Sequence, residues 1–200
     1  MQEQHYSIVF RPSESVIAEI RDMKRQLAET GNYGSRNAEA HITVLEFFAR
    51  ENQIAIVERY MQDFASSVCN LIYRFDRYGS FPEKYTKENG VFYVAPTNES
   101  ALLLDRLSAK FHEHFPLKGK VRAIPSGKPH MTIGRRLQQQ RVDKAYEIFS
   151  AQTVEMECVC TLALRVKRIN FPEQFKVMTE FEFTGEGEDF SGNRYSSIAG

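Results

Sequence analysis

Long apolar runs and a set of paired cysteines are both missing from this chain of 200 residues. No apolar run approaches the roughly 20 residues that a membrane helix needs, and the N-terminus lacks the basic and apolar segments of a secretory signal. Three cysteines are an odd number and do not make a disulfide framework. We therefore expect a globular cytoplasmic protein with no membrane partner.

The chain also lacks a net charge, because 26 Lys and Arg balance 26 Asp and Glu. It has no overall basic footprint of the kind that drives sequence-independent binding to long nucleic acid. No acidic residue lies between Glu113 and Asp143, although this interval contains seven lysines and arginines. The local excess suits a phosphate-bearing ligand, and a solvated basic loop explains it equally well.

Common site motifs are absent as well. The sequence has no P-loop, no G-x-G-x-x-G after a strand and no G-x-S-x-G around a serine. His112 and His114 look like a metal-binding pair, but an offset of two on a helix does not bring side chains to one face. Cys158 and Cys160 lie far away in a predicted strand, so a zinc site would need a coincidence. We expect no metal and no other cofactor.

What the chain does contain is the same order of elements in two halves, residues 1–90 and 91–184. Each half opens with a strand-like run and a proline, followed by a helical pattern, a loop with glycine and a His-apolar-Thr-apolar run. A second helical pattern and a strand-like run then lead to Phe-Pro-Glu, at Phe81 and at Phe171. Such agreement indicates a duplication. We predict one bilobal domain over residues 1–184, in which the last strand of each half either stays in its own lobe or is exchanged between lobes.

The end of the chain has a different character. A final alternating run places Phe175, Val177, Phe181 and Phe183 on one face, which predicts a half-buried strand. Residues 185–200 are rich in glycine and serine and have no periodicity, which predicts a flexible tail.

The repeated motifs are HITV, beginning at His41, and HMTI, beginning at His130. The side-chain period of a strand is two, so His41 shares a face with Thr43, and His130 with Thr132. If a pseudo-twofold axis relates the halves, these faces can meet across a shared cleft. One neutral imidazole could then accept a proton from an attacking oxygen, the other could protonate a leaving oxygen, and the hydroxyls could hold a phosphate. Either motif alone would fit an ordinary packed strand.

Arg135 lies five positions after His130, an odd offset that places it on the opposite face of a regular strand. Gly134 can interrupt the strand with a bulge and return the guanidinium to the cleft. We therefore predict that Arg135 binds phosphate. The first half has Glu46 at the corresponding place, so the two motifs can play unequal roles.

With these motifs, the chain resembles the 2H phosphoesterase superfamily, which includes 2′-5′ RNA ligase-like proteins and RNA 2′,3′-cyclic phosphodiesterases. The likeness extends from Tyr6 to Phe183 and rests on both His-x-Thr motifs, the proline after each opening strand and Arg135. It implies an α+β fold, bilobal and duplicated. Two pseudo-twofold-related lobes would line a central cleft with antiparallel sheets and carry their helices outside.

The resemblance also implies a metal-independent phosphodiesterase that acts on 2′,3′-cyclic phosphate ends of RNA or on related small cyclic or 2′-5′ phosphodiesters. Ligation of RNA through a 2′-5′ bond would be the reverse reaction. His41 and His130 would be the catalytic acid and base, in an order that the sequence does not assign, and Thr43, Thr132 and Arg135 would bind the substrate. The expected partner is a nucleotide or RNA end, with no protein partner, and we expect a monomer. The alternative is a non-catalytic protein that binds RNA ends or phosphorylated nucleotides in the same cleft.

Overall fold

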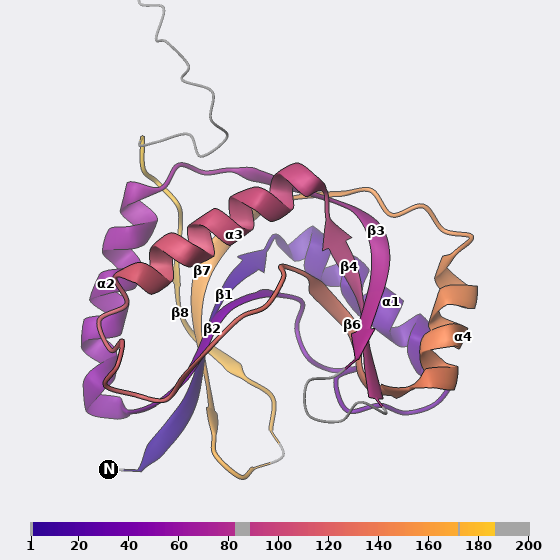
Figure 1. Cartoon of the computed structure of the whole chain (residues 1–200), viewed down its shortest axis with the longest axis horizontal. Helices are drawn as coiled ribbons and strands as arrows, with labels where there is room; N and C mark the ends of the chain where they lie inside the picture. The colour runs from indigo at the N-terminus through magenta and orange to yellow at the C-terminus, as the bar shows by residue number, and fades with distance from the viewer. Residues whose placement is uncertain (1, 83–88, 172, 187–200) are drawn as a thin grey trace, which may run out of the picture.

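The computed structural model describes residues 2–82, 89–171 and 173–186 (Figure 1). Glu83 and Pro172 of the two Phe-Pro-Glu runs lie outside the described residues, as do residues 187–200 of the predicted tail. No helix in the described part of the chain is long and apolar enough to cross a membrane.

Both halves of the described chain contain the strands and helices that their patterns predict. The first half forms β1 (Glu3–Pro12), α1 (Glu14–Ala28), β2 (Ile42–Arg50), a short 3-10 helix (Glu51–Gln53), α2 (Ile54–Ser67) and β3 (Ile72–Pro82). The second half forms β4 (Asn89–Pro96), α3 (Asn98–Glu113), β5 (Ala123–Pro125), β6 (Met131–Gln138), α4 (Gln139–Phe149), β7 (Met156–Arg168) and β8 (Lys176–Phe181). The short strand β5, within the loop before His130, was not predicted.

Local chemistry explains several boundaries of these elements. Pro12 and Pro96 end the two opening strands, because proline has no N–H to donate to the strand ladder. The helix α3 begins after Thr97, whose hydroxyl accepts a hydrogen bond from the backbone N–H of Ser100 at 3.2 Å. After α1 the chain turns at Gly31, whose φ of +131° is open to glycine but not to residues with a side chain.

The strands form one eight-stranded sheet in the order β5-β2-β1-β7-β3-β4-β6, and β8 also pairs with β7. Every pairing in the described residues is antiparallel. Antiparallel strands with helices packed against them confirm the predicted α+β class.

The long strand β7 lies in the middle of this sheet and joins its two parts. Its residues Cys160–Arg168 pair with β1, whereas Met156–Val159 pair with β3. We call β1, β2, β5, β8 and the C-terminal part of β7 lobe A, and β3, β4, β6 and the N-terminal part of β7 lobe B. The strand that leads to the Phe-Pro-Glu run of each half therefore pairs with the opening strand of the other half, since β3 pairs with β4 and β7 with β1.

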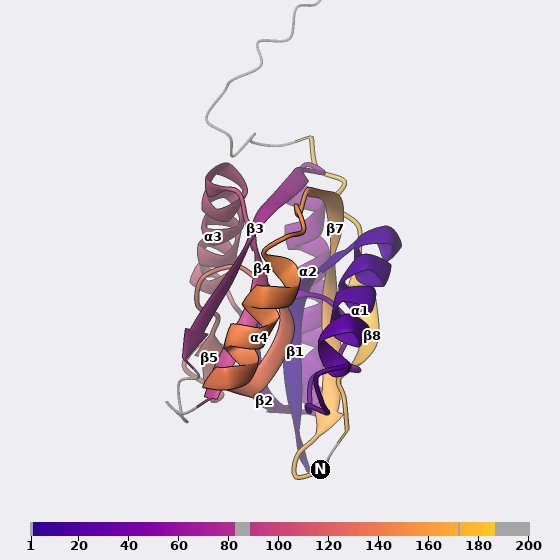
Figure 2. The same cartoon turned by 90° about the vertical axis from the view of Figure 1, so that its right-hand side faces the viewer.

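Each lobe has an apolar face covered by helices. In lobe A the buried side chains of this face are Tyr6, Ile8, Phe10, Leu45, Phe47, Leu162 and Leu164. The helix α2 lies against lobe A and α4 against lobe B, at opposite ends of the molecule (Figures 1 and 2). The helices α1 and α3 reach between lobes, because α1 contacts β6 and β7, and α3 contacts β2, β3 and β4.

The opposite face of lobe A is polar. Antiparallel pairing sets Ser7 between Glu46 and Arg165, and it sets His5 between Phe48 and Lys167. Directly paired residues project to the same side of a sheet. We call this the polar face of lobe A, and it comprises His5, Ser7, Thr43, Glu46, Phe48, Arg165 and Lys167.

The prediction for β8 is wrong in one respect. Val177 was expected on the buried face, but its side chain is 38% exposed, whereas Phe183 is 4% exposed. The pairing with β7 shifts between Leu164–Thr179 and Arg165–Val177, which leaves Met178 as an extra residue. This bulge breaks the alternation on which the prediction depended.

Aromatic side chains of α2 and α3 pack against one another, and removal of one of them should lower the stability of the protein. The ring of Phe111 is fully buried and contacts the rings of Tyr60, Phe64 and Phe115. We expect Phe111→Ala to lower the free energy of unfolding by about 3 to 5 kcal/mol, measured by urea denaturation. Leu102→Ala on the same helix, where the side chain is 51% exposed, should change it by less than about 0.5 kcal/mol. Equal effects of the two changes would contradict the assigned packing.

Candidate active site

Each histidine of the repeated motifs directly precedes a strand. His41 precedes β2 and His130 precedes β6, and both side chains are partly exposed. Thr43 pairs with Val9, and Thr132 pairs with Tyr93 at the equivalent place in the other lobe. The charge of His130 contributes to lowering the pKa of His41, so the two imidazoles lie close enough to interact. The structure therefore brings the two motifs to one site.

Both imidazoles make the same local hydrogen bond. Nδ1 of His41 donates to the carbonyl of Glu39 at 2.7 Å, and Nδ1 of His130 donates to the carbonyl of Lys128 at 2.8 Å. A carbonyl can only accept, so in each neutral ring the proton is on Nδ1 and the lone pair is on Nε2. Among the described residues, nothing hydrogen-bonds to either Nε2 or to the hydroxyls of Thr43 and Thr132. All four groups are available to a ligand.

A β-bulge follows each motif threonine. The pairing passes from Thr43–Val9 to Leu45–Ile8 in lobe A, and it passes from Thr132–Tyr93 to Gly134–Phe92 in lobe B. One extra residue reverses the alternation beyond it, so the residue three positions after each threonine returns to the threonine's face. These residues are Glu46 in lobe A and Arg135 in lobe B.

Arg135 thus lies on the face of Thr132, and the bulge that places it there lies directly before Gly134. The bulges fall on either side of Gly134, and the left-handed residue is Arg136, with φ of 57°. A Cβ at this position would lie 2.8 Å from Cδ1 of Leu137 and 2.9 Å from Cδ2 of Leu27 on α1, so these leucine side chains would have to shift. The charge of Arg135 lowers the pKa of both His130 and Glu46, which places its guanidinium near both motifs.

The carbonyls at the two bulges are held by side chains from elsewhere in the fold. Nε2 of His112 on α3 donates to the carbonyl of Val44 at 2.8 Å, and the hydroxyl of Tyr33 donates to that of Ile133 at 3.2 Å. His112 is therefore a structural group, while His114 is exposed. The described part of the chain contains no group of three or more His, Cys, Asp or Glu suited to a metal ion.

The loop between α1 and β2 connects the two motifs. Oγ of Ser35 in this loop accepts a hydrogen bond from the backbone N–H of Arg135 at 2.9 Å. Nζ of the buried Lys24 donates to the carbonyl of Ala38, close to His41, at 2.6 Å. The loop that leads into the first motif is thereby attached to the strand of the second motif.

The two imidazoles have unequal surroundings. The pKa of His41 lies well below its ordinary value, because of burial first and then of the positive charges of Arg165 and Lys24. The pKa of His130 is also lowered, mainly by burial, and the rings of Phe81 and Tyr93 lie 5.1 Å from its ring. Burial is the main cause at both imidazoles; the charges of Arg165 and Lys24 add to it at His41, and the charge of Arg135 adds to it at His130.

Arg165 was missed by the sequence analysis. Its side chain on β7 is only 4% exposed and donates from Nη2 to the hydroxyl of Ser7 at 3.0 Å. Its Nε has no hydrogen-bond partner, and no carboxylate in the described residues forms an ion pair with it. The carboxylates of Glu46 and Glu39 act on it only at longer range, so this buried guanidinium lacks a contact ion pair and favours an anionic ligand. The available signal was a single charged residue within the apolar run TLALRV.

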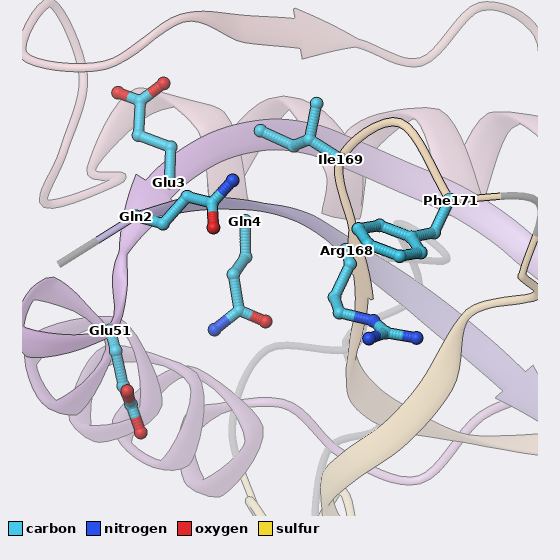
Figure 3. A pocket seen from close by; sticks show the side chains of 7 residues that line it. All are labelled: Gln2, Glu3, Gln4, Glu51, Arg168, Ile169 and Phe171. Carbon is cyan, nitrogen blue, oxygen red and sulfur yellow. The ribbon is translucent and has the colours of Figure 1, made fainter.

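Two pockets lie away from the motifs. One, of about 300 Å³, is lined by side chains around the start of β1 and the end of β7, among them Gln4, Glu51 and Arg168 (Figure 3). The other lies beside Arg11 and Cys160. Neither contains a motif residue.

Comparison with known proteins identifies the family. The model of the 2′-5′ RNA ligase superfamily matches residues 11–169, and a search of curated proteins found no match. TT0787 of Thermus thermophilus has a TM-score of 0.60 and 18% identity, over 91% of this chain and 99% of that chain. Usb1 of Kluyveromyces marxianus has a TM-score of 0.51 and 14% identity, over 88% of this chain and 96% of that chain. These structures share the fold, and the family model spans most of the sequence. The predicted family is confirmed, and the chain belongs to the 2′-5′ RNA ligase superfamily of 2H phosphoesterases.

Proposed function

We propose that this protein is a metal-independent phosphodiesterase that opens 2′,3′-cyclic phosphate ends of RNA, or related small cyclic or 2′-5′ phosphodiesters. The observation that carries the proposal is the pair of Nδ1–carbonyl hydrogen bonds at His41 and His130. These bonds occupy Nδ1 of each ring and leave each Nε2 for a ligand, on a histidine two positions before a motif threonine. Acid–base catalysis at a phosphodiester needs two such groups, one without and one with a proton.

The surroundings favour distinct roles for the two histidines. His41, next to Arg165 and Lys24, is the base that accepts a proton from the attacking water at Nε2. His130, on which Arg135 acts instead of Arg165 and Lys24, is the acid that donates its Nε2 proton to the leaving ribose oxygen as the bond from phosphorus to that oxygen breaks. A bound phosphate anion raises the pKa of a neighbouring imidazole, which supplies the proton on His130. The product is a phosphomonoester next to a free hydroxyl.

Four groups are proposed to hold the phosphate. The hydroxyls of Thr43 and Thr132 donate to its non-bridging oxygens, and Arg135 approaches from lobe B. Arg165 contributes from β7, where its Nε is free of hydrogen bonds to the described residues. Donors fixed by packing stabilise the negative charge that develops on a phosphoryl group in the transition state.

Two related activities remain alternatives. Ligation through a 2′-5′ bond is the same reaction in reverse, and hydrolysis dominates in water when RNA ends are dilute. A non-catalytic protein that binds RNA ends would also explain the buried Arg165, because a bound anion compensates the charge of its guanidinium without any reaction. Affinity for a cyclic-phosphate nucleotide without any product after long incubation would favour this binding protein.

Replacement of either motif histidine tests the catalytic proposal. We expect His41→Ala and His130→Ala each to lower kcat for a nucleoside 2′,3′-cyclic phosphate by about 10² to 10⁴, with a chelator present. His114→Ala is the matched control, because this imidazole is 68% exposed and lies at the end of α3, and it should retain full activity. Full activity in either motif variant would refute the assignment.

The pH dependence tests the role of His41 as the base. A base must be unprotonated, so activity falls as the pH drops through the pKa of His41. Arg165→Met removes a positive charge that lowers this pKa, so we expect the acidic limb of kcat/KM to move to higher pH. The same change should lower kcat/KM by about 10² to 10³ at the optimum, as does the loss of an oxyanion donor.

Arg168→Met is the matched control for this measurement. Arg168 lies three residues further along β7 and pairs with Glu173 at the surface. The acidic limb of kcat/KM in Arg168→Met should coincide with that of the unmodified protein. An acidic limb that does not move in Arg165→Met would show that His41 is not the base.

A further inference from the structure

The polar face of lobe A continues beyond the candidate active site. Arg165, Ser7 and Glu46 form one row across the sheet, and Lys167, His5 and Phe48 form the next row. Two residues along a strand correspond to about 6.6 Å. The second row is therefore one short step away from the cation that we assign to the reacting phosphate.

Aromatic rings lie against Lys167 in this second row and against Arg122, which contacts Phe48 of the same row. Nζ of Lys167 lies 4.5 Å from the ring centre of Phe175, and Cζ of Arg122 lies 4.9 Å from that of Phe48. His5 stacks on Phe48 at 4.4 Å and meets the edge of Phe175 at 5.0 Å. Contact with a ring face orients a cation without neutralising its charge, as a carboxylate would.

Positive charge from lobe B reaches the same place. The pKa of Lys167 is lowered by burial, then by the charges of Arg135, Arg136 and Arg165, while Glu46 opposes this shift. The carboxylate of Glu46 accepts a hydrogen bond from Nε2 of His5 at 2.9 Å. The charges of Arg135 and Arg136 from lobe B and of Arg165 from β7 thus act on Lys167 together with the carboxylate of Glu46.

We propose that Lys167 and the second row bind the phosphate adjacent to the reacting one, so that the preferred substrate carries two phosphates. An internucleotide phosphodiester at the 3′ end of an oligonucleotide fits this description. A 5′-phosphate on a nucleoside 2′,3′-cyclic phosphate presents the same chemistry at the same place. The inference rests on the proposed phosphodiesterase function and adds its substrate class.

Three substrates separate these sources. They are a nucleoside 2′,3′-cyclic phosphate, the same compound with a 5′-phosphate, and a trinucleotide that ends in a 2′,3′-cyclic phosphate. We expect the second and third to exceed the first in kcat/KM by about tenfold or more, the gain of one charge-assisted contact. An equal gain for the second and third would assign the effect to the phosphate itself, and a larger gain for the trinucleotide would assign it to the internucleotide phosphodiester.

Variants of Lys167 then locate the contact. In Lys167→Met the ratio of kcat/KM between the two-phosphate and one-phosphate substrates should fall to about one, while Lys167→Arg should restore most of it, since it keeps the charge. Lys144→Met is the matched control, because Lys144 lies on α4 and pairs with Glu147, and its ratio should match that of the unmodified protein.

The outcomes distinguish this inference from the function on which it rests. No turnover of any substrate would refute the phosphodiesterase. Turnover of all three substrates with equal kcat/KM would leave the phosphodiesterase intact and overturn the second-phosphate site. An equal loss on all three substrates in Lys167→Met would also overturn it, since Lys167 would then act through folding or through the reacting phosphate. A gain for the trinucleotide that Lys167→Met does not reduce would place the contact elsewhere and would refute the assignment to Lys167.

Discussion

The backbone pairing of β7 is the constraint on which the rest of the site depends. This strand pairs with β1 through Cys160–Arg168 and with β3 through Met156–Val159, so both lobes are hydrogen-bonded to one continuous backbone. The loop before β2 adds a second connection through Ser35 and Arg135. Two motifs on separate lobes can cooperate only if the distance between them is fixed, and these two connections fix it. Arg165 lies on the shared strand, and its charge acts on His41 of the first motif.

The duplication repeats local geometry but not tertiary surroundings. Both motifs have the same Nδ1–carbonyl bond and the same bulge after the threonine, because these features arise within a few residues. The equivalent places on the neighbouring strands differ: Arg165 pairs with Ser7, whereas Phe81 pairs with Val91. A guanidinium therefore acts on His41, whereas a phenyl ring lies beside His130, so the two imidazoles have different surroundings. In the proposed mechanism, these surroundings let one motif, used twice, supply a base and an acid.

The sequence predicted what local patterns determine and missed what distant pairing determines. The order of strands and helices, both His-x-Thr motifs and the family follow from periodicity and motif spacing. Arg165 was missed because its place next to Ser7 joins residues 158 positions apart. The bulges around Gly134 and the exposure of Val177 depend on register with a neighbouring strand, which alternation within one strand does not reveal. The sequence suggests a metal-binding pair at His112 and His114, yet Nε2 of His112 donates to the carbonyl of Val44, at the bulge on β2.

The distribution of charge explains how a chain with no net charge can favour a polyanion. Several exposed cations are paired with carboxylates, as Arg168 is with Glu173 and Lys144 with Glu147. On the polar face of lobe A, aromatic rings take the place of carboxylates: Phe175 lies beneath both Arg165 and Lys167. A ring holds a cation in position and leaves its charge for a ligand, whereas a carboxylate would have to be displaced. The position of Phe175 between these two cations therefore ties the reacting phosphate and its neighbour to one structural element, the turn that joins β7 to β8.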